Sequence, residues 1–341
     1  MNWIDTYFKG DRLIWLAVFM LSIFSLLAVY SSTGTLAYKY HSGNTEYYLF
    51  KHGIILVFGF LLMYFAHLVK YTFYMRIAKF ALLVVVPLLA LTLLGGTNLN
   101  DASRWLTLPI INLSFQTSDL AKLALILFVA RSLSVKQNNI KDLKTAFIPV
   151  ILPILIVCGL ILPANFSTAA VLFTTCLFLM FVGRIKLKYI TALILIAGVC
   201  FSMFIGIASV VGFEGRIGTW QKRVENFISG DEEENYQVTQ AKIAVATGGI
   251  IGKGPGNSTQ RNFLPHPYSD FIFAIIVEEY GLLGALVIVT LYILLFYRVV
   301  LLVRKSPMAF ATLLAIGCCF SLVFQAMINM AVAVNLFPVT G

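Results

Sequence analysis

Long apolar runs separated by short polar segments are the feature that most limits what this chain can fold into. A membrane core about 30 Å thick needs about 20 apolar residues of helix to cross it, and a helix satisfies its own backbone there. Nine runs are candidates, and they lie near 13–30, 53–68, 77–94, 118–133, 146–162, 167–183, 190–212, 270–297 and 308–331. The sequence therefore predicts an all-α polytopic membrane protein, with residues 1–341 forming a single integral membrane domain.

The placement of charged residues predicts an orientation. Charged residues make up 12% of the chain, against about 25% in soluble domains. A cytoplasmic N-terminus puts 15 of the 25 Lys and Arg residues into short inside segments, as the positive-inside rule expects. The same orientation puts the long loop 213–269, between spans 7 and 8, outside the cytoplasm. Because the basic residues are distributed in this way, no nucleic-acid partner is expected.

The cysteines and histidines do not form a recognisable metal site. All five cysteines lie inside apolar runs and none forms a CxxC pair, which is typical of small buried hydrophobic residues. The four histidines are scattered without the spacing of metal ligands. The sequence therefore predicts no metal bound by the protein itself.

The stretch from Tyr236 to Gly284 differs from the rest of the chain, because glycines and prolines bend its backbone repeatedly. Near its end, Asp270 directly precedes an apolar run, and Glu278 and Glu279 follow two turns later. Carboxylates at the mouth of a membrane helix are costly and call for a reason. Asp270 is a candidate general acid or base, or a simple helix cap. On a helix Glu278 falls near the face of Asp270, so the two could line one cavity.

Cations on the predicted outer side could bind a phosphate, or they could be solvated surface charges. Arg104, Lys253 and Arg261 are among them. Gly252 and Lys253 resemble the end of a phosphate-binding loop, but Gly254 stands where that loop needs Ser or Thr. A Walker-type NTPase is therefore excluded.

A shorter outer loop carries a second polar group. Arg104 stands beside Trp105, and Asp119 and Lys122 follow where the fourth span begins. Three residues apart on a helix, Asp119 and Lys122 share a face and can neutralise each other. The pair is either a structural clamp or part of a polar cavity.

These stretches together resemble the SEDS family of bacterial membrane proteins that build peptidoglycan, and the FtsW branch more than the RodA branch. Arg104-Trp105 with Gln116 to Asp119 and Lys122 is similar to the family's RW…QPSE..K pattern. The turn Pro163 to Ala169 resembles its QPDLGTA turn. Four further stretches are also similar to the family pattern. They are Tyr236-Gln237 with Gln240-Ala241, the glycine-rich segment Gly248 to Ser258, Leu264-Pro265 with Asp270 to Ala274, and Glu278-Glu279.

Several positions depart from the family pattern. Asp119 replaces a glutamate, Asn165 replaces an aspartate, and His266 replaces the glutamate of the LPE triplet. Asn165 could instead cap the helix that follows it. The family has ten spans and this sequence stops at Gly341, so we expect a form truncated before the last transmembrane helix.

The resemblance implies a glycosyltransferase that polymerises lipid II on the outer face of the bacterial cytoplasmic membrane. The acceptor hydroxyl would attack the anomeric carbon with inversion, and undecaprenyl pyrophosphate would leave. Asp270 is then the implied catalytic base. The residues implied to bind substrate are Arg104, Trp105, Asp119, Lys122, Gln240, Lys253, Ser258, Glu278 and Glu279. No cofactor is certain, although Mg²⁺ or Mn²⁺ could bridge the pyrophosphate.

The resemblance also implies partners and a place in the cell. The substrates would be lipid II and the nascent glycan strand, and a class B penicillin-binding protein would supply the transpeptidase, alongside other division proteins. The chain would be a multi-pass protein of the division septum. Two other functions stay open: a lipid II flippase or transporter, and a non-catalytic division scaffold.

Overall fold

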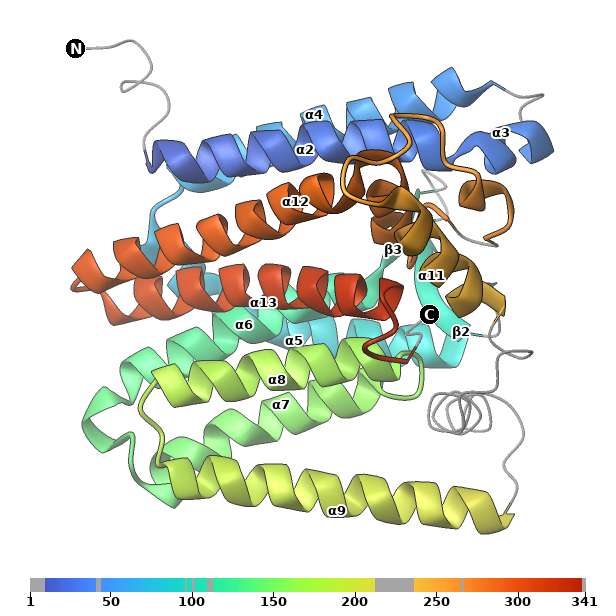
Figure 1. Ribbon diagram of the computed structural model, residues 1–341. Helices are drawn as coiled ribbons and strands as arrows, with labels where there is room; N and C mark the ends of the chain where they lie inside the picture. The colour runs from blue at the N-terminus through green and yellow to red at the C-terminus, as the bar shows by residue number, and fades with distance from the viewer. Residues whose placement is uncertain are drawn as a thin grey trace, which may run out of the picture. The chain divides into compact units, whose positions relative to one another are not determined.

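The computed structural model describes residues 10–40, 44–95, 97–99, 102–108, 113–211, 236–264 and 267–338 (Figure 1). Helices dominate these ranges, and one long helix matches each apolar run that the sequence contains. They are α2 (Arg12–Ser32), α4 (Thr45–Leu68), α5 (Tyr71–Gly95), α6 (Thr117–Val135), α7 (Ile148–Ile161), α8 (Phe166–Val182), α9 (Leu187–Val211), α12 (Ile272–Lys305) and α13 (Ala309–Ala333). The all-α membrane fold is therefore confirmed.

Within the described residues, six helical segments are long and apolar enough to cross a membrane, and these are α2, α4, α5, Leu143–Ile161 with α7, α12 and α13. The helix α8 and the first part of α9 are apolar but shorter. The helix α6 carries three charged residues, Asp119, Lys122 and Arg131. The nine helices support the predicted positions of the spans, and the number of spans stays a prediction.

By its internal contacts the chain divides into two compact units. Unit 1 contains Met1–Leu68, Arg223–Leu302 and Val323–Gly341, and unit 2 contains Val69–Lys222 and Val303–Leu322. A membrane bundle can be built from two such units, so the single integral domain stays a prediction. Each unit is described by itself below.

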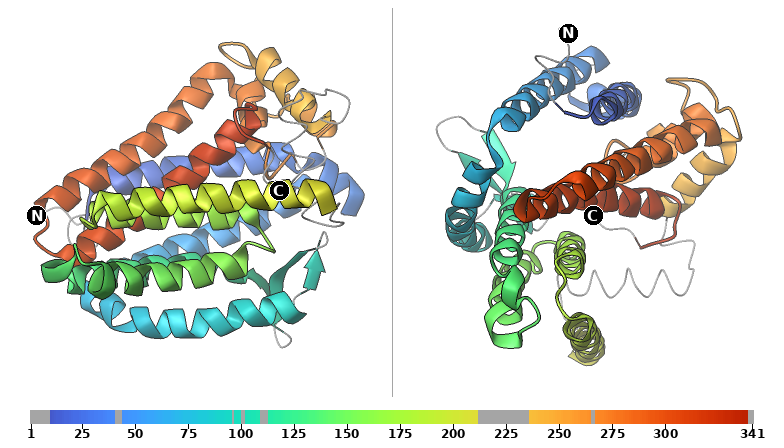
Figure 2. Two further views of the ribbon diagram at one scale, coloured as in Figure 1. Left: turned by 90° about the horizontal axis from the view of Figure 1, so that it is seen from below. Right: turned by 90° about the vertical axis from the view of Figure 1, so that its left-hand side faces the viewer.

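Unit 1 contains α2, α4, the short helices α3 (Gly34–Tyr40) and α11 (Tyr236–Gly248), and most of α12. The helix α2 packs along α4, as both views of Figure 2 show. Asp11 caps α2, because its Oδ1 accepts a hydrogen bond of 2.9 Å from Leu13 N. The same carboxylate binds Arg298 near the far end of α12, with Nε to Oδ2 at 3.1 Å. This ion pair fastens α2 to α12.

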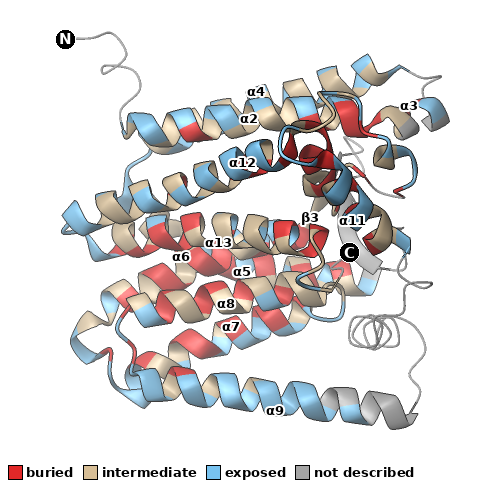
Figure 3. Cartoon of the chain, viewed as in Figure 1, coloured by how far each residue is buried: buried red, intermediate tan, exposed pale blue. Residues whose placement is uncertain are grey.

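Unit 2 contains α5 to α9 and the first part of α13. Its core lies between α6, α7 and α8, where Leu125, Leu133, Ile154 and Leu172 are fully buried (Figure 3). The helix α9, in contrast, is largely exposed along its described length. Apolar side chains that face outwards in this way are what a helix beside lipid requires.

A three-stranded antiparallel sheet, which the sequence did not predict, joins α5 to α6. Its strands are β1 (Thr97–Leu99), β2 (Ala102–Leu108) and β3 (Leu113–Gln116), in the order β1-β2-β3. The register sets Trp105 opposite Gln116. Tryptophan and threonine favour strands, and each of these strands is only three to seven residues long. A strand pattern this short is a weaker sequence signal than the long apolar runs on either side of it.

Candidate functional site

The helix α12 is broken at Gly281, which has φ 68° and ψ −170°. A left-handed backbone of this kind costs little only for glycine. The break gives α12 two parts, a first part from Ile272 to Tyr280 and a second part that continues to Lys305. The predicted start of this span, at residue 270, also shifts, because the helix begins at Ile272 and leaves Asp270 in the turn before it.

The loop that follows α11 supplies the hydrogen bonds that the broken helix lacks. Lys253 N and Gly254 N donate to the carbonyls of Glu278 and Glu279, both at 2.9 Å. In return, Leu282 N donates to Gly249 O at 3.0 Å. A membrane protein tolerates non-helical backbone only where other groups satisfy it, so the loop and the broken helix require each other.

This exchange explains why the stretch is rich in glycine. A Cβ on Gly252 would lie 2.2 Å from Glu279 O, and a Cβ on Gly281 would lie 2.2 Å from Ile250 O. Both distances are too short for any side chain. The glycines therefore allow two backbones to touch, which is a more specific role than the bending that the sequence suggested.

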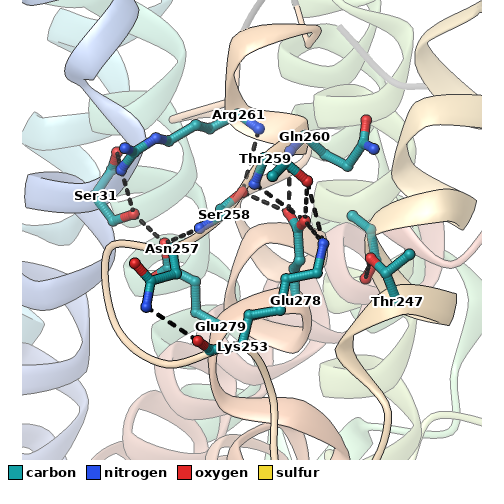
Figure 4. Close-up of polar contacts among 11 residues, drawn as sticks. Ser31, Thr247, Lys253, Asn257, Ser258, Thr259, Gln260, Arg261, Glu278 and Glu279 are labelled. Carbon is teal, nitrogen blue, oxygen red and sulfur yellow. Dashed lines mark hydrogen bonds and ion pairs between the residues drawn. The ribbon is translucent and has the colours of Figure 1, made fainter.

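Glu278 is fully buried, and its carboxylate accepts hydrogen bonds from the loop on every side (Figure 4). Lys253 Nζ lies 2.5 Å from Oε1, and Ser258 Oγ donates to Oε2 at 2.5 Å. Thr259 Oγ1 and N donate to Oε1 at 2.8 and 3.1 Å, and Gln260 N donates to Oε2 at 3.2 Å. The carboxylate has no accessible surface left for a substrate.

Glu279 is held in a similar way and is 1% exposed. Its Oε1 accepts hydrogen bonds from Ser31 Oγ at the end of α2 and from Ser258 N at 3.3 Å. The sequence predicted that Glu278 could line one cavity with Asp270 and that Glu278 and Glu279 bind substrate, whereas the folded loop covers both glutamates. With Lys253 and the 3% exposed Ser258, they form an anchor for the loop. We refer to these four residues as the loop anchor.

Asp270 is different from the two glutamates. It lies in the turn just before α12 and is only partly buried. Within the described residues its carboxylate makes no hydrogen bond or ion pair, so it does not act as the helix cap that the sequence left open. The next residue, Phe271, is 2% exposed and packs in a cluster with Ala241 and Ala244 of α11. A firmly packed neighbour thus holds an unpaired carboxylate at the start of the helix.

Gln240 lies on α11, next to Ala241 of this cluster, and is partly buried. It belongs to unit 1 with Asp270 and the loop anchor. His266, where the family pattern has a glutamate, lies outside the described residues. Within the described residues, no three His, Cys, Asp or Glu side chains gather to hold a metal ion.

The other predicted contacts lie in unit 2. Lys122 Nζ is 2.8 Å from Asp119 Oδ1, and the side chains are 14% and 59% exposed respectively. The predicted shared face is confirmed. Arg104 and Trp105 lie on β2, and their side chains are outside the described residues.

A small, mainly apolar cavity lies beside the start of α6, and its polar lining residues are Thr92, Thr117, Ser118 and Asn165. Asn165 also caps α8, because its Oδ1 accepts a hydrogen bond of 3.2 Å from Thr168 N. The capping that the sequence suggested is therefore confirmed.

Sequence reasoning missed Ser31, Thr259 and Gln260. Ser31 ends an apolar run, and a run of three hydroxyl residues there, Ser31 to Thr33, is buried although it is polar. That run was the available signal, since buried hydroxyl groups need partners.

Comparisons with known proteins agree with this arrangement. The family model described as "Cell cycle protein", of FtsW, RodA and SpoVE, matches residues 11–341. The chain is 30% identical to a probable peptidoglycan glycosyltransferase FtsW of Geobacter sp. (strain M18), over 97% of this chain and 89% of the relative. It is 31% identical to the stage V sporulation protein E of Bacillus subtilis (strain 168), with the same coverage.

Solved structures share the fold. One is a chain from a structure of a peptidoglycan synthase complex, described as the structural coordination of polymerization and crosslinking by that complex. It superposes with a TM-score of 0.75 at 22% identity and covers 98% of this chain and 90% of that one. The rod shape determining protein RodA of Thermus thermophilus, a mutant form, gives a TM-score of 0.67 at 21% identity, covering 98% and 88%.

Proposed function

This chain belongs to the FtsW, RodA and SpoVE family of cell cycle proteins, and we propose that it is a peptidoglycan glycosyltransferase that polymerises lipid II during cell division. The observation that supports this most directly is Asp270, whose carboxylate bonds none of the described residues and which precedes a helix whose two buried acids are already satisfied. A general base must be free to accept a proton, and within α12 and the turn before it only Asp270 meets that need.

In the proposed reaction Asp270 accepts the proton of the acceptor sugar's hydroxyl. It must come within about 3 Å of that oxygen. The oxygen attacks the anomeric carbon of the growing strand, the bond from that carbon to the pyrophosphate oxygen breaks, and undecaprenyl pyrophosphate leaves with the electron pair. A nearby carboxylate also favours the positive charge that develops on the sugar ring. Attack from the side opposite the leaving group inverts the anomeric centre.

The loop anchor has an indirect part in this proposal. Lys253, Ser258, Glu278 and Glu279 bind one another and so fix the first part of α12, which follows Asp270. Direct substrate contact is proposed instead for Arg104, Trp105, Asp119, Lys122 and Gln240, by resemblance to the family pattern. Among these, Asp119 is largely exposed and open to a ligand.

A divalent cation, Mg²⁺ or Mn²⁺, is proposed to accompany the pyrophosphate of the substrate rather than to occupy a protein site. Within the described part of the chain no cluster of acidic or histidine side chains would hold it. The carboxylates of Glu278 and Glu279 are taken up by donors of the protein. Such an ion would stabilise the charge of the leaving pyrophosphate.

The proposed setting is the bacterial cytoplasmic membrane at the division septum, with the N-terminus in the cytoplasm and Asp270 outside. A class B penicillin-binding protein is the proposed partner, because glycan strands must be crosslinked once they are made. The relatives named FtsW support a role in division.

The test uses the full chain in proteoliposomes with fluorescently labelled lipid II. We expect the wild type to form glycan, and Asp270→Ala to form none while it stays folded. Lipid II movement between leaflets that survives in Asp270→Ala, with no glycan from the wild type, would instead establish a flippase. Binding of the transpeptidase without glycan or lipid movement would establish a scaffold.

A further inference from the structure

Arg261 connects both buried acids, although it contacts neither carboxylate directly. It belongs to the short helix η3 (Gln260–Asn262) in the loop that the anchor holds. Its backbone reaches one serine and its guanidinium reaches another, and each serine donates to a different glutamate (Figure 4). All of these residues lie in unit 1.

The first connection runs through Ser31 at the end of α2. Arg261 Nη1 donates to Ser31 O at 3.1 Å and to Ser31 Oγ at 3.3 Å. Ser31 Oγ donates in turn to Glu279 Oε1. A hydroxyl has one proton and two lone pairs, so it can accept from the cation and donate to the carboxylate at the same time. Ser31 is 2% exposed, which makes this bridge dry.

The second connection runs through Ser258 in the loop. Arg261 N donates to Ser258 Oγ at 3.2 Å, and Ser258 Oγ donates to Glu278 Oε2 at 2.5 Å. Ser258 N also donates to Glu279 at 3.3 Å. Ser258 therefore touches both acids, and Arg261 fixes the orientation of its hydroxyl.

The guanidinium of Arg261 makes no other hydrogen bond within the described residues. Arg261 Nε is buried without a hydrogen-bond partner there, and Arg261 forms no direct ion pair with a described carboxylate. Arg261 as a whole is half-buried, and the cost of partly burying its charge depends on the surroundings. Through the Ser31 bridge the guanidinium lies near Glu279, whereas Ser258 accepts from the backbone N of Arg261.

We propose that Arg261 and Ser31 are positioning residues for the glycosyl transfer. They tie the end of α2 to the loop and, through Glu278 and Glu279, to the part of α12 that follows Asp270. This inference rests on the proposed function, since it concerns the position of the proposed base. A misplacement of about 1 Å can lower a rate by about a hundredfold, so a link of this kind acts on kcat rather than on substrate binding.

The test compares neighbouring serines at the end of α2. Ser31→Ala removes the hydroxyl that bridges Arg261 and Glu279. Ser32→Ala is the matched control, because Ser32 is also buried and its hydroxyl bonds only Val29 O of its own helix. Ser31→Thr keeps the bridging hydroxyl, and Arg261→Lys keeps the charge but loses Nη1, the guanidinium nitrogen that donates to both oxygens of Ser31. Purified full chain in proteoliposomes is measured for kcat and KM with labelled lipid II, and for its thermal unfolding midpoint.

We expect Ser31→Ala and Arg261→Lys to lower kcat about tenfold or more, with KM within about twofold of wild type. Ser31→Thr should recover most of the rate, and Ser32→Ala should match the wild type. If Ser31→Ala lowers only the unfolding midpoint and the folded fraction keeps its kcat, the link is structural and the positioning role is wrong. If the wild type makes no glycan, the proposed function itself fails. These two failures are distinguished by the wild-type rate.

Discussion

Two regions of the chain carry acids at the start of a helix, and the structure gives them opposite environments. At the start of α6, Asp119 is 59% exposed and pairs with one lysine on its own helix. In α12, Glu278 is 0% exposed and receives hydrogen bonds from five donor groups of a loop that precedes it. In the sequence both regions show an acid beside an apolar run, but the lysine is three residues away in α6 and 25 residues away for Glu278.

The difference teaches that burial and the number of donors, rather than spacing, decide what an acid does. An exposed pair such as Asp119 and Lys122 contributes less than about 1 kcal/mol and leaves its carboxylate open to a ligand. A buried carboxylate that loses its partners costs about 3–5 kcal/mol. Asp270 belongs to neither region, because it is only partly buried and bonds no described residue, yet it directly precedes the packed Phe271.

The largest effect is expected where the loop and α12 touch through their backbones. Gly281→Ala would place a Cβ 2.2 Å from Ile250 O at a positive φ. Since neither backbone can move without breaking the exchanged hydrogen bonds, we expect a loss of more than about 4 kcal/mol and little folded protein. The measurement is the yield of folded protein and its thermal unfolding in detergent.

Gly59→Ala in α4 is the control for this change. A Cβ there has no atom within 4 Å, so it should alter stability by no more than about 1 kcal/mol. Similar unfolding midpoints for the two variants would contradict the tight contact at Gly281.

A smaller loss of stability is expected for substitutions of the acids themselves, and its size should differ between the two acidic regions. Glu278→Gln replaces an acceptor of five donor groups by an amide with its own protons, and we expect it to lower the free energy of unfolding by about 3 kcal/mol. Asp119→Asn should lower it by less than about 1 kcal/mol. Denaturant or thermal unfolding of the two variants measures both values, and equal losses would remove the distinction between the regions.

The smallest effect is expected at the other end of α12, which is held by the ion pair between Asp11 and Arg298 and not by the loop anchor. The hydrogen bond from Arg298 holds the pKa of Asp11 below its usual value, although burial opposes this shift. A carboxylate whose pKa is lowered in the folded state stabilises the protein at every pH above its pKa in the unfolded chain, which is about 3.9. That stabilisation is lost as the pH falls through the pKa of the folded state.

We therefore expect the unfolding midpoint of the wild type to fall below about pH 4 by more than that of Asp11→Asn. The two proteins are compared by thermal unfolding from pH 7 down to pH 3. A pH dependence that is identical in both would show that Asp11 does not contribute.

The helices were predictable because each apolar run is long and contains few charged residues. Their ends were less so: α4 begins at Thr45, eight residues before the predicted 53, because the polar and aromatic turn before that run is helical too. The sheet between α5 and α6 was missed, since its strands are only three to seven residues long. Asn165 was predicted as a cap because an N-cap depends on the local sequence alone.

The roles of the acids could be predicted only in part. Asp270 was singled out by its place before an apolar run, and its carboxylate bonds no residue in the described ranges. Glu278 and Glu279 were expected to meet a substrate, but the loop folds back over them through contacts between residues about 20 apart. Ser31, more than 200 residues away, completes that network. Helical spacing carries no information about such distant partners.

The most direct test of this account compares Asp270→Asn with the wild type for glycan formation per folded molecule, alongside the unfolding midpoint of each. Because the carboxylate of Asp270 makes no bond within the part of the chain that the structure describes, the account predicts a midpoint within about 1 °C of wild type, corresponding to a change below about 0.5 kcal/mol. It also predicts a fall in kcat of at least about a hundredfold. A variant that keeps its rate, or that loses rate only because it unfolds, would contradict the claim that Asp270 is the reactive acid and the glutamates are its support.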